Sequence, residues 1–200
     1  MKTERQDKIL EILKERKFAT VSYLSEHLYS SAPTIRRDLK ELFEKGFIQR
    51  SHGGAILSDN ENSPIPLDFR NQKQISEKIG ICNKAASLIK ESSVIFIDCS
   101  TTTFHLADHI PQNKNITVVT NSYVLCSKLN EKNITTYCTG GILIPQSKAF
   151  AGKRAEMCVG DFCADIIFFS SHALDEYGRI TDYSDIETNL RKTMLENARI

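Results

Sequence analysis

The sequence predicts an α/β protein with an N-terminal α+β winged helix-turn-helix and a C-terminal Rossmann-like parallel sheet. Short amphipathic helices separated by turns occupy the first 45 residues, and a glycine-centred pair of apolar segments follows them. Farther on, apolar strands alternate with helical stretches, which favours parallel pairing through right-handed crossovers. We therefore expect a first domain over residues 1–58, a linker over 59–67 and an α/β domain over 68–200.

The composition is that of an ordinary globular protein. The 200 residues suffice for two small cores, and 40% of them are hydrophobic and 26% charged. The formal net charge of +1 is too small to indicate a nucleic-acid partner by itself. The N-terminal segment MKTERQDK is too charged for a secretory signal, and no apolar run has membrane-spanning length. We expect a cytoplasmic protein without a membrane partner.

The cysteines and histidines give no metal pattern. The six cysteines lack CxxC or Cys/His ligand spacing, and several lie in apolar stretches where a free thiol behaves as a small hydrophobe. His105 and His109 are four residues apart, but no third ligand is evident. We therefore predict no metal, no cofactor and mainly buried structural thiols at Cys82, Cys99, Cys126, Cys138, Cys158 and Cys163.

The first two helices are predicted from caps and apolar spacing. The first runs over Glu4–Arg16, and Thr3 and Gln6 fit a capping box in which each side chain satisfies a free backbone N–H. Ser22 is expected to cap the second helix. Their inward side chains would be Ile9, Ile12, Leu13, Leu24 and Leu28.

A third helix follows the turn at 29–30. Ser31 is expected to cap it, Pro33 is tolerated in its first turn because no helical N–H bond is lost there, and Gly46 ends it. Its predicted inward face consists of Ile35, Leu39, Leu42 and Phe43.

The outward face of this third helix suits the DNA major groove. Arg36 and Arg37 each offer a planar fork that can bind guanine O6 and N7, and Lys40 and nearby hydroxyls suit phosphate oxygens. The alternative is a solvated helix face, since paired arginines are common. The predicted DNA-contacting residues are Ser31, Pro33, Thr34, Arg36, Arg37, Lys40, Arg50 and His52.

The segment FIQRSHGGAIL predicts a β-hairpin, the wing of the helix-turn-helix. Its turn is expected at Gly53–Gly54, and Arg50 and His52 would reach the DNA backbone or the neighbouring minor groove. After it, DNENSPIP at 59–66 is polar, contains two prolines and lacks periodicity, so it reads as a linker.

The second domain is predicted as alternating helices and strands. A long helix is expected over Asp68–Lys90, and a final helix over Asp185–Ile200, with no Gly, Pro or cap to end it. The predicted strands are Ser93–Ile97, Ile116–Thr120, Ile134–Cys138 and Asp165–Ser170. Helical stretches are predicted at Phe104–His109, Tyr123–Asn130 and Lys153–Val159.

Polar or glycine residues follow three of these strands, where ligands of open α/β sheets collect. Asp98 could accept from sugar hydroxyls, and the hydroxyls at 100–103 lead into a helix N-terminus that favours a phosphate. Plain N-capping and a structural Gly-Gly turn are the alternatives. Arg191 or Lys192 would close over an anion, unless both are simply solvated. The predicted ligand residues are Asp98, Ser100, Thr101, Thr102, Asn121, Gly140, Gly141 and Lys192.

These motifs together resemble the DeoR family of transcriptional regulators from Arg5 to Ile200. The resemblance rests on TIRRDL at 34–39, GFIQRSHGGA at 46–55, VIFIDCSTTT at 94–103, VVTNS at 118–122, TGG at 139–141 and LDEYGRITD at 174–182. It implies a repressor of sugar or nucleoside catabolism that binds double-stranded operator DNA. It also implies a homo-oligomer, dimer or tetramer, and a sensor domain similar in fold to ribose-5-phosphate isomerase. A phosphorylated sugar bound there would weaken operator binding.

The chain departs from the family pattern in three places. Ser100 replaces a common glycine, and 170–172 reads Ser-Ser-His where many relatives have a glycine-containing turn. Relatives also continue with another strand, so we expect the sensor domain to be incomplete at its C-terminus. A truncated regulator that binds DNA without responding to an effector is therefore one alternative. A sugar-phosphate isomerase is another, but Asp98 and Asp175 form no convincing acid–base pair, and we predict no catalytic residue.

Overall fold

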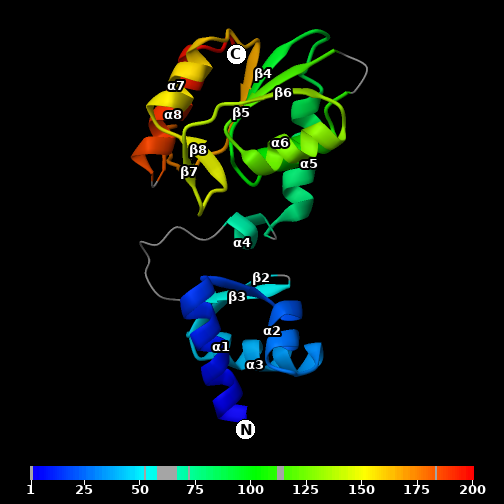
Figure 1. Cartoon of the computed structure of the whole chain (residues 1–200), viewed down its shortest axis with the longest axis vertical. Helices are drawn as coiled ribbons and strands as arrows, with labels where there is room; N and C mark the ends of the chain where they lie inside the picture. Colours follow the sequence, from blue (N-terminus) through cyan, green and yellow to red (C-terminus); the bar gives the residue numbers. More distant parts are fainter. Residues whose placement is uncertain (1, 52, 58–66, 72, 112–114, 183) are drawn as a thin grey trace. The chain divides into compact units, whose positions relative to one another are not determined.

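The computed structural model describes residues 2–51, 53–57, 67–71, 73–111, 115–182 and 184–200. The chain divides into two compact units, Met1–Lys73 and Gln74–Ile200 (Figure 1). The residues predicted as a linker, up to position 66, lie outside the described residues, as does His52. The first unit extends beyond the expected residue 58, because it includes the short helix α4 (Leu67–Asn71), which contacts its sheet.

The first unit is a winged helix-turn-helix. Its helices are α1 (Lys2–Arg16), α2 (Val21–His27) and α3 (Ala32–Glu44). A three-stranded antiparallel sheet has the order β1-β3-β2, formed by β1 (Phe18–Thr20), β2 (Ile48–Ser51) and β3 (Gly54–Leu57). The buried core consists of Ile9, Leu13, Ala19, Val21, Leu24, Ile35, Leu39, Leu42, Ile48 and Ala55.

Three local predictions for this unit are wrong. Thr3 lies within α1, which begins at Lys2, and the Gln6 amide donates to Glu41 over 2.8 Å instead of forming a capping box. Thr20, not Ser22, caps α2, because its hydroxyl accepts from the backbone N–H of Tyr23 at 3.1 Å. Phe43 is 52% exposed, because it comes directly after the buried Leu42 and lies outside the buried face of α3.

The hairpin turn lies one residue earlier than predicted. Ser51 pairs with Gly54, so Gly54 belongs to β3. A Cβ at this glycine would lie 2.6 Å from the carbonyl oxygen of Ala19. Glycine is therefore needed here for the close approach of β1.

The second unit contains the parallel sheet that the sequence predicts. Its order is β6-β5-β4-β9, and all neighbouring strands are parallel. The four strands match the four predicted ones and run over β4 (Val94–Ile97), β5 (Thr117–Thr120), β6 (Thr135–Cys138) and β9 (Ile166–Phe168). Each end of each strand lies within two residues of its predicted position.

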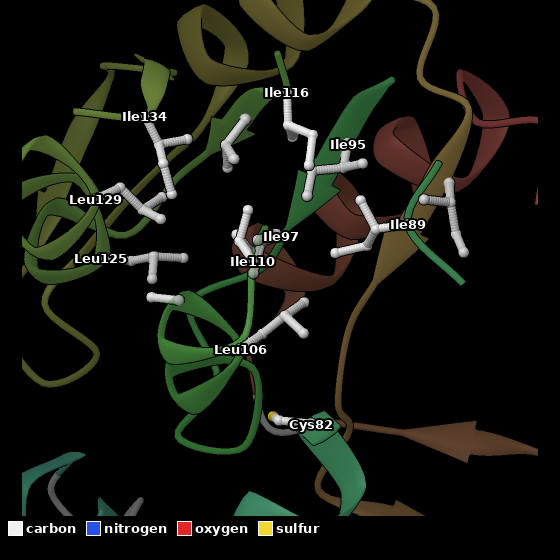
Figure 2. Close-up of a cluster of buried hydrophobic side chains, with 13 residues drawn as sticks. Cys82, Ile89, Ile95, Ile97, Leu106, Ile110, Ile116, Leu125, Leu129 and Ile134 are labelled. Atoms are coloured by element: carbon white, nitrogen blue, oxygen red, sulfur yellow. The ribbon is translucent and has the colours of Figure 1, made fainter. Parts of the chain in front are cut away.

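Helices cover both faces of this sheet (Figure 1). On one face lie α5 (Ile75–Ala86), the 3₁₀ helix η1 (Thr103–Asp108) and α6 (Tyr123–Glu131), which pack on Ile95 and Ile97 (Figure 2). On the other lie α7 (Lys153–Gly160) and α8 (Asp185–Glu196), which pack on Phe96. Successive residues of β4 thus serve opposite cores, as the twofold period of a strand requires.

Two hairpins, not predicted from the sequence, accompany the sheet. They are β7 (Ile142–Ile144) with β8 (Ala149–Ala151), and β10 (Ala173–Leu174) with β11 (Ile180–Thr181). The backbone N–H of Phe150 in β8 donates to the carbonyl of Asn121 over 2.8 Å. The first hairpin is thereby held against the carboxyl end of β5.

Two helix predictions for this region are also wrong. The helix expected over Asp68–Lys90 is divided into α4 and α5, which belong to different units, and Gln74 before α5 has a φ of +51°. The last helix ends at Glu196, not Ile200. Beyond it the chain runs beside β9, where the backbone N–H of Ile167 donates to the carbonyl of Ile200 over 2.8 Å.

Candidate nucleic-acid interface and ligand site

The outward face of α3 carries the predicted cationic side chains. Arg36, Arg37 and Lys40 are all exposed, whereas Ile35 and Leu39 of the same helix are fully buried. The helix therefore presents its positive charges on the side opposite the core. This is the arrangement that a recognition helix needs to enter a major groove.

The remaining predicted contacts lie at the ends of this face. Ser31 is the N-terminal residue before α3, and its hydroxyl lies 2.9 Å from that of Thr34. Ser31 and the first-turn Pro33 are exposed, and Thr34 is half-buried. Arg50 is half-buried on β2. The Ser31 side chain makes no cap to the helix backbone, so its hydroxyl and that of Thr34 remain near the surface.

A buried ion pair fixes the orientation of α3. Asp38 is fully buried, and its two carboxylate oxygens accept from Arg5 Nε at 2.5 Å and from Arg5 Nη2 at 3.2 Å. The hydrogen bond to Asp38 raises the pKa of the Arg5 guanidinium, although burial opposes this. A two-point contact restricts the rotation of α3 against α1, which keeps Arg36 and Arg37 outward. The local sequence does not indicate this role, because Arg5 and Asp38 are 33 residues apart.

Asp98 organises the carboxyl end of β4. Its Oδ1 accepts from the backbone N–H of Ser100 at 3.0 Å and from the Thr103 hydroxyl at 2.8 Å. Its Oδ2 accepts from the backbone N–H of Ser170 at 3.2 Å and lies 3.5 Å from Arg191 Nε. The side chain is buried. Asp98 thus ties the ends of β4 and β9 to α8.

The hydroxyl-bearing residues that follow β4 differ in their hydrogen bonds and in their burial. Ser100 Oγ accepts from the backbone N–H of Thr103 at 3.2 Å, which agrees with the capping alternative for this residue. Thr101 is buried, and Ser100 and Thr102 are half-buried. The carbonyl of Thr102 accepts from the Cys82 thiol at 3.0 Å.

Arg191 is the cation that α8 brings to the strand ends. Its Nη1 donates to Asp182 over 2.6 Å. Burial lowers the pKa of the guanidinium, but the charges of Asp98 and Asp182 outweigh burial and raise it overall. Lys192, the predicted ligand residue, is exposed. The structure therefore brings Arg191, rather than Lys192, to Asp98.

Several buried polar atoms near the strand ends have no hydrogen-bond partner within the described part of the chain. They are Asn121 Oδ1, Glu187 Oε1 and Arg191 Nε. The Asn121 amide nitrogen donates to the carbonyl of Phe150 over 3.0 Å, so only its oxygen is left. All three side chains influence the buried Cys99 thiol, whose pKa is raised mainly by burial. Buried polar atoms without partners are costly, and a polar ligand would satisfy them.

The two glycines after β6 have different surroundings. Gly141 has a φ of +110°, and a Cβ there would lie 2.6 Å from the carbonyl oxygen of Ala151. Its lack of a side chain is therefore required by the packing of β8. Gly140 has a φ of +62°, and nothing lies within 4 Å of a Cβ built on it.

The other chemical candidates have structural roles. Asp175 accepts from the backbone N–H groups of Tyr177 and Arg179 and stabilises the β10–β11 turn. Among the described residues, no group of three or more His, Cys, Asp or Glu could hold a metal ion. No helix in the described part of the chain is long and apolar enough to span a membrane.

The prediction of mainly buried thiols is wrong. All six cysteines are free, but only Cys82 and Cys99 are buried. Cys126 and Cys158 are half-buried, and Cys138 and Cys163 are exposed. An apolar stretch in the sequence does not show that every residue in it faces the core, because β6 lies at the edge of the sheet.

Comparison with known proteins assigns both units. The family model described as the DeoR-like helix-turn-helix domain matches residues 5–61, and the DeoR C terminal sensor domain matches residues 73–200. The chain is 34% identical over 195 residues to the HTH-type transcriptional regulator GlpR of Haloferax volcanii, covering 98% of this chain and 76% of that protein. It is 33% identical to the HTH-type transcriptional regulator GolR of Listeria innocua, covering 96% and 76%. It is 32% identical to the L-fucose operon activator of Haemophilus influenzae, covering 96% and 77%. The chain therefore belongs to the DeoR family of helix-turn-helix transcriptional regulators.

Proposed function

We propose that the chain is a sequence-specific DNA-binding repressor of a carbohydrate catabolism or uptake operon. The observation that supports this best is the exposed cationic face of α3, with Arg36, Arg37 and Lys40, held outward by the buried pair of Arg5 and Asp38. Arginine at the start of a recognition helix reads guanine, and Lys40, Arg50 and His52 bind phosphates. The protein acts in the cytoplasm as a homo-oligomer, because two half-sites need two copies of the helix.

The second unit responds to a phosphorylated sugar. Three buried polar atoms near the carboxyl ends of the strands have no hydrogen-bond partner among the described residues, which supports a polar ligand there. The cationic Arg191 supports an anionic group on that ligand. The proposed ligand residues are Asp98, Ser100, Thr101, Thr102, Asn121, Gly140, Gly141 and Arg191, with Lys192 at the periphery. The ligand lowers operator affinity by binding the low-affinity arrangement more tightly.

DNA binding is tested with the duplex upstream of the protein's own gene. In a fluorescence anisotropy titration at moderate salt, Arg36→Ala/Arg37→Ala is expected to weaken binding at least tenfold, since each bidentate arginine–guanine contact contributes about 1–3 kcal/mol. The matched control is Lys8→Ala/Lys14→Ala, which removes the same charge from exposed positions of α1. Equal affinity of the Arg36/Arg37 variant and the unmodified protein would refute the proposed interface.

The response to a ligand is tested separately by calorimetry with a panel of pentose and hexose phosphates. We expect one of them to bind and to weaken the complex with the duplex. A chain that binds the duplex but none of the sugar phosphates would be a regulator without effector response, and the sensor part of the proposal would fail. The operator experiment would be unaffected by that result.

A further inference from the structure

Two cysteines lie together at the carboxyl end of the sheet. Cys138 is the last residue of β6 and pairs in register with Thr120, the last residue of β5. Cys126 lies in the first turn of α6, where its backbone N–H donates to the carbonyl of Ser122 over 3.0 Å. Because α6 packs against β6, the crossover brings the two positions to the same end. Each thiol affects the pKa of the other, so the two side chains lie close together.

The environment of the pair distinguishes its two sulfur atoms. Cys138 is exposed and Cys126 half-buried. The pKa of Cys138 is lowered to about 6, mainly by the neighbouring Cys126 thiol and also by the backbone N–H groups of Gly140 and Thr139, against the effect of burial. The neighbouring Cys138 and burial raise the pKa of Cys126. At neutral pH the pair therefore consists of an accessible thiolate and a neighbouring thiol.

We propose that Cys126 and Cys138 form a reversible disulfide when the protein meets a hydroperoxide. An accessible thiolate beside a second cysteine is the arrangement that redox-sensing proteins use. Three of the other cysteines lack an accessible thiolate. Cys82 and Cys99 are buried, and the half-buried Cys158 has a raised pKa, mainly because of burial.

The chemistry requires only the two cysteines and the hydroperoxide. The Cys138 thiolate attacks one oxygen of hydrogen peroxide, an S–O bond forms, the O–O bond breaks, and hydroxide leaves. The Cys126 sulfur then attacks the Cys138 sulfur, the S–S bond forms, and the S–O bond breaks. The second hydroxide leaves, and the two hydroxides take up the two thiol protons, so that two thiols and one peroxide give one disulfide and two waters.

The disulfide would act on the turn that follows β6. Gly140 and Gly141 follow Cys138 after Thr139, and both have positive φ values. Gly141 packs directly on β8. A covalent bond from Cys138 to α6 restricts the start of this turn. Any effect on ligand binding rests on the proposed sensor function of the second unit, whereas the formation of the disulfide does not.

The experiment treats the reduced full chain with one equivalent of hydrogen peroxide and counts free thiols. We expect the loss of two of the six free thiols, a Cys126–Cys138 link in the peptide map, and full recovery with dithiothreitol. In Cys126→Ser, oxidation should stop at a sulfenic acid on Cys138, which dimedone traps. The matched control is Cys163→Ser, because Cys163 is also exposed but is not part of the pair.

Two outcomes would overturn the proposal. One is a peptide map without the Cys126–Cys138 link, and the other is loss of that link in Cys163→Ser. The dimedone trap in Cys126→Ser tests the reactivity of Cys138 separately from the formation of the disulfide. Calorimetry then compares the reduced and oxidised protein with the sugar phosphate that binds the reduced form. A change in affinity of threefold or more supports the effect on the turn, and equal affinities refute it. If no sugar phosphate binds either form, the proposed sensor function fails while the peptide map still decides the disulfide.

Discussion

Arg5 and Asp38 join α1 to the recognition helix through two hydrogen bonds, and the Asp38 carboxylate is completely buried. The pair lies directly behind the two arginines that face outward from α3. Loss of Arg5 would leave a buried charge without its partner, which is more costly than the loss of a surface ion pair.

Arg5→Ala is expected to lower the free energy of unfolding of the first unit by about 2–3 kcal/mol, because the buried carboxylate loses its counter-charge. Urea denaturation followed by circular dichroism measures this change. Lys8→Ala, at an exposed position of the same helix, should change it by less than about 0.5 kcal/mol. Similar curves for the two variants would show that the pair does not stabilise the unit.

Tyr29→Asn is expected to stabilise the first unit by about 0.5–1 kcal/mol, because asparagine tolerates the left-handed backbone better than tyrosine. Tyr29 has a φ of +47° and is 97% exposed, so the substitution removes no packing. Thermal unfolding provides the measurement. Tyr29→Phe keeps the same backbone strain and should leave the melting temperature unchanged. A lower melting temperature for Tyr29→Asn would contradict this account.

Gly141→Ala and Gly140→Ala should differ although the two residues are neighbours. Both have a positive φ, which costs about 1 kcal/mol for alanine, but only at Gly141 does the added Cβ meet a backbone carbonyl. We expect Gly141→Ala to destabilise the second unit by about 3 kcal/mol in total, since overpacking adds to the strain. Denaturant titration of both variants tests the difference. Equal midpoints would mean that β8 moves aside without cost.

The reactivity of Cys138 should depend on pH with a midpoint of about 6. Only the thiolate is alkylated, so the rate with iodoacetamide rises through pH 6 and levels off above it. Mass spectrometry of the Cys138 peptide at each pH gives the profile. In urea the midpoint should move to about 8.5, the value of an ordinary thiol. In Cys126→Ala it should also rise, because the largest cause of the low pKa is lost. A midpoint near 8.5 in the folded protein would rule out a stabilised thiolate.

Arg191→Gln and Lys192→Gln separate the predicted ligand cation from the one that the structure supports. For a sugar phosphate that binds, we expect Arg191→Gln to weaken binding at least tenfold and Lys192→Gln less than twofold. Calorimetry measures both, and the melting temperature of the second unit identifies any loss of folding. A larger effect at Lys192 would favour the original prediction.

The sequence predicted the elements that have a strong local signal. The strands β4 and β9 are continuous apolar runs, and the recognition helix has a proline in its first turn and a glycine at its end. The strand β1 has only three residues and exists because Phe18 pairs with Ile56, far along the chain. Such pairing leaves no periodic pattern in a short segment, so the sequence could not indicate it.

The errors at the candidate sites have similar physical causes. Arg191 and Lys192 differ by about 100° around α8, and the sequence alone does not fix the rotation of that helix against the sheet. The contact between Cys126 and Cys138 depends on the crossover from β5 to β6. The importance of Asp38 depends on Arg5, 33 residues away. Each of these pairs becomes visible only when distant segments are placed together.

The Asp98 carboxylate accepts hydrogen bonds from Ser100, Thr103 and Ser170, all within the chain itself. These internal bonds hold the end of β4 in one arrangement. A molecule that binds there does not have to freeze these groups, so little of its interaction energy is lost to conformational entropy. Pre-organisation of this kind allows a compact solute to be held tightly by only a few polar contacts.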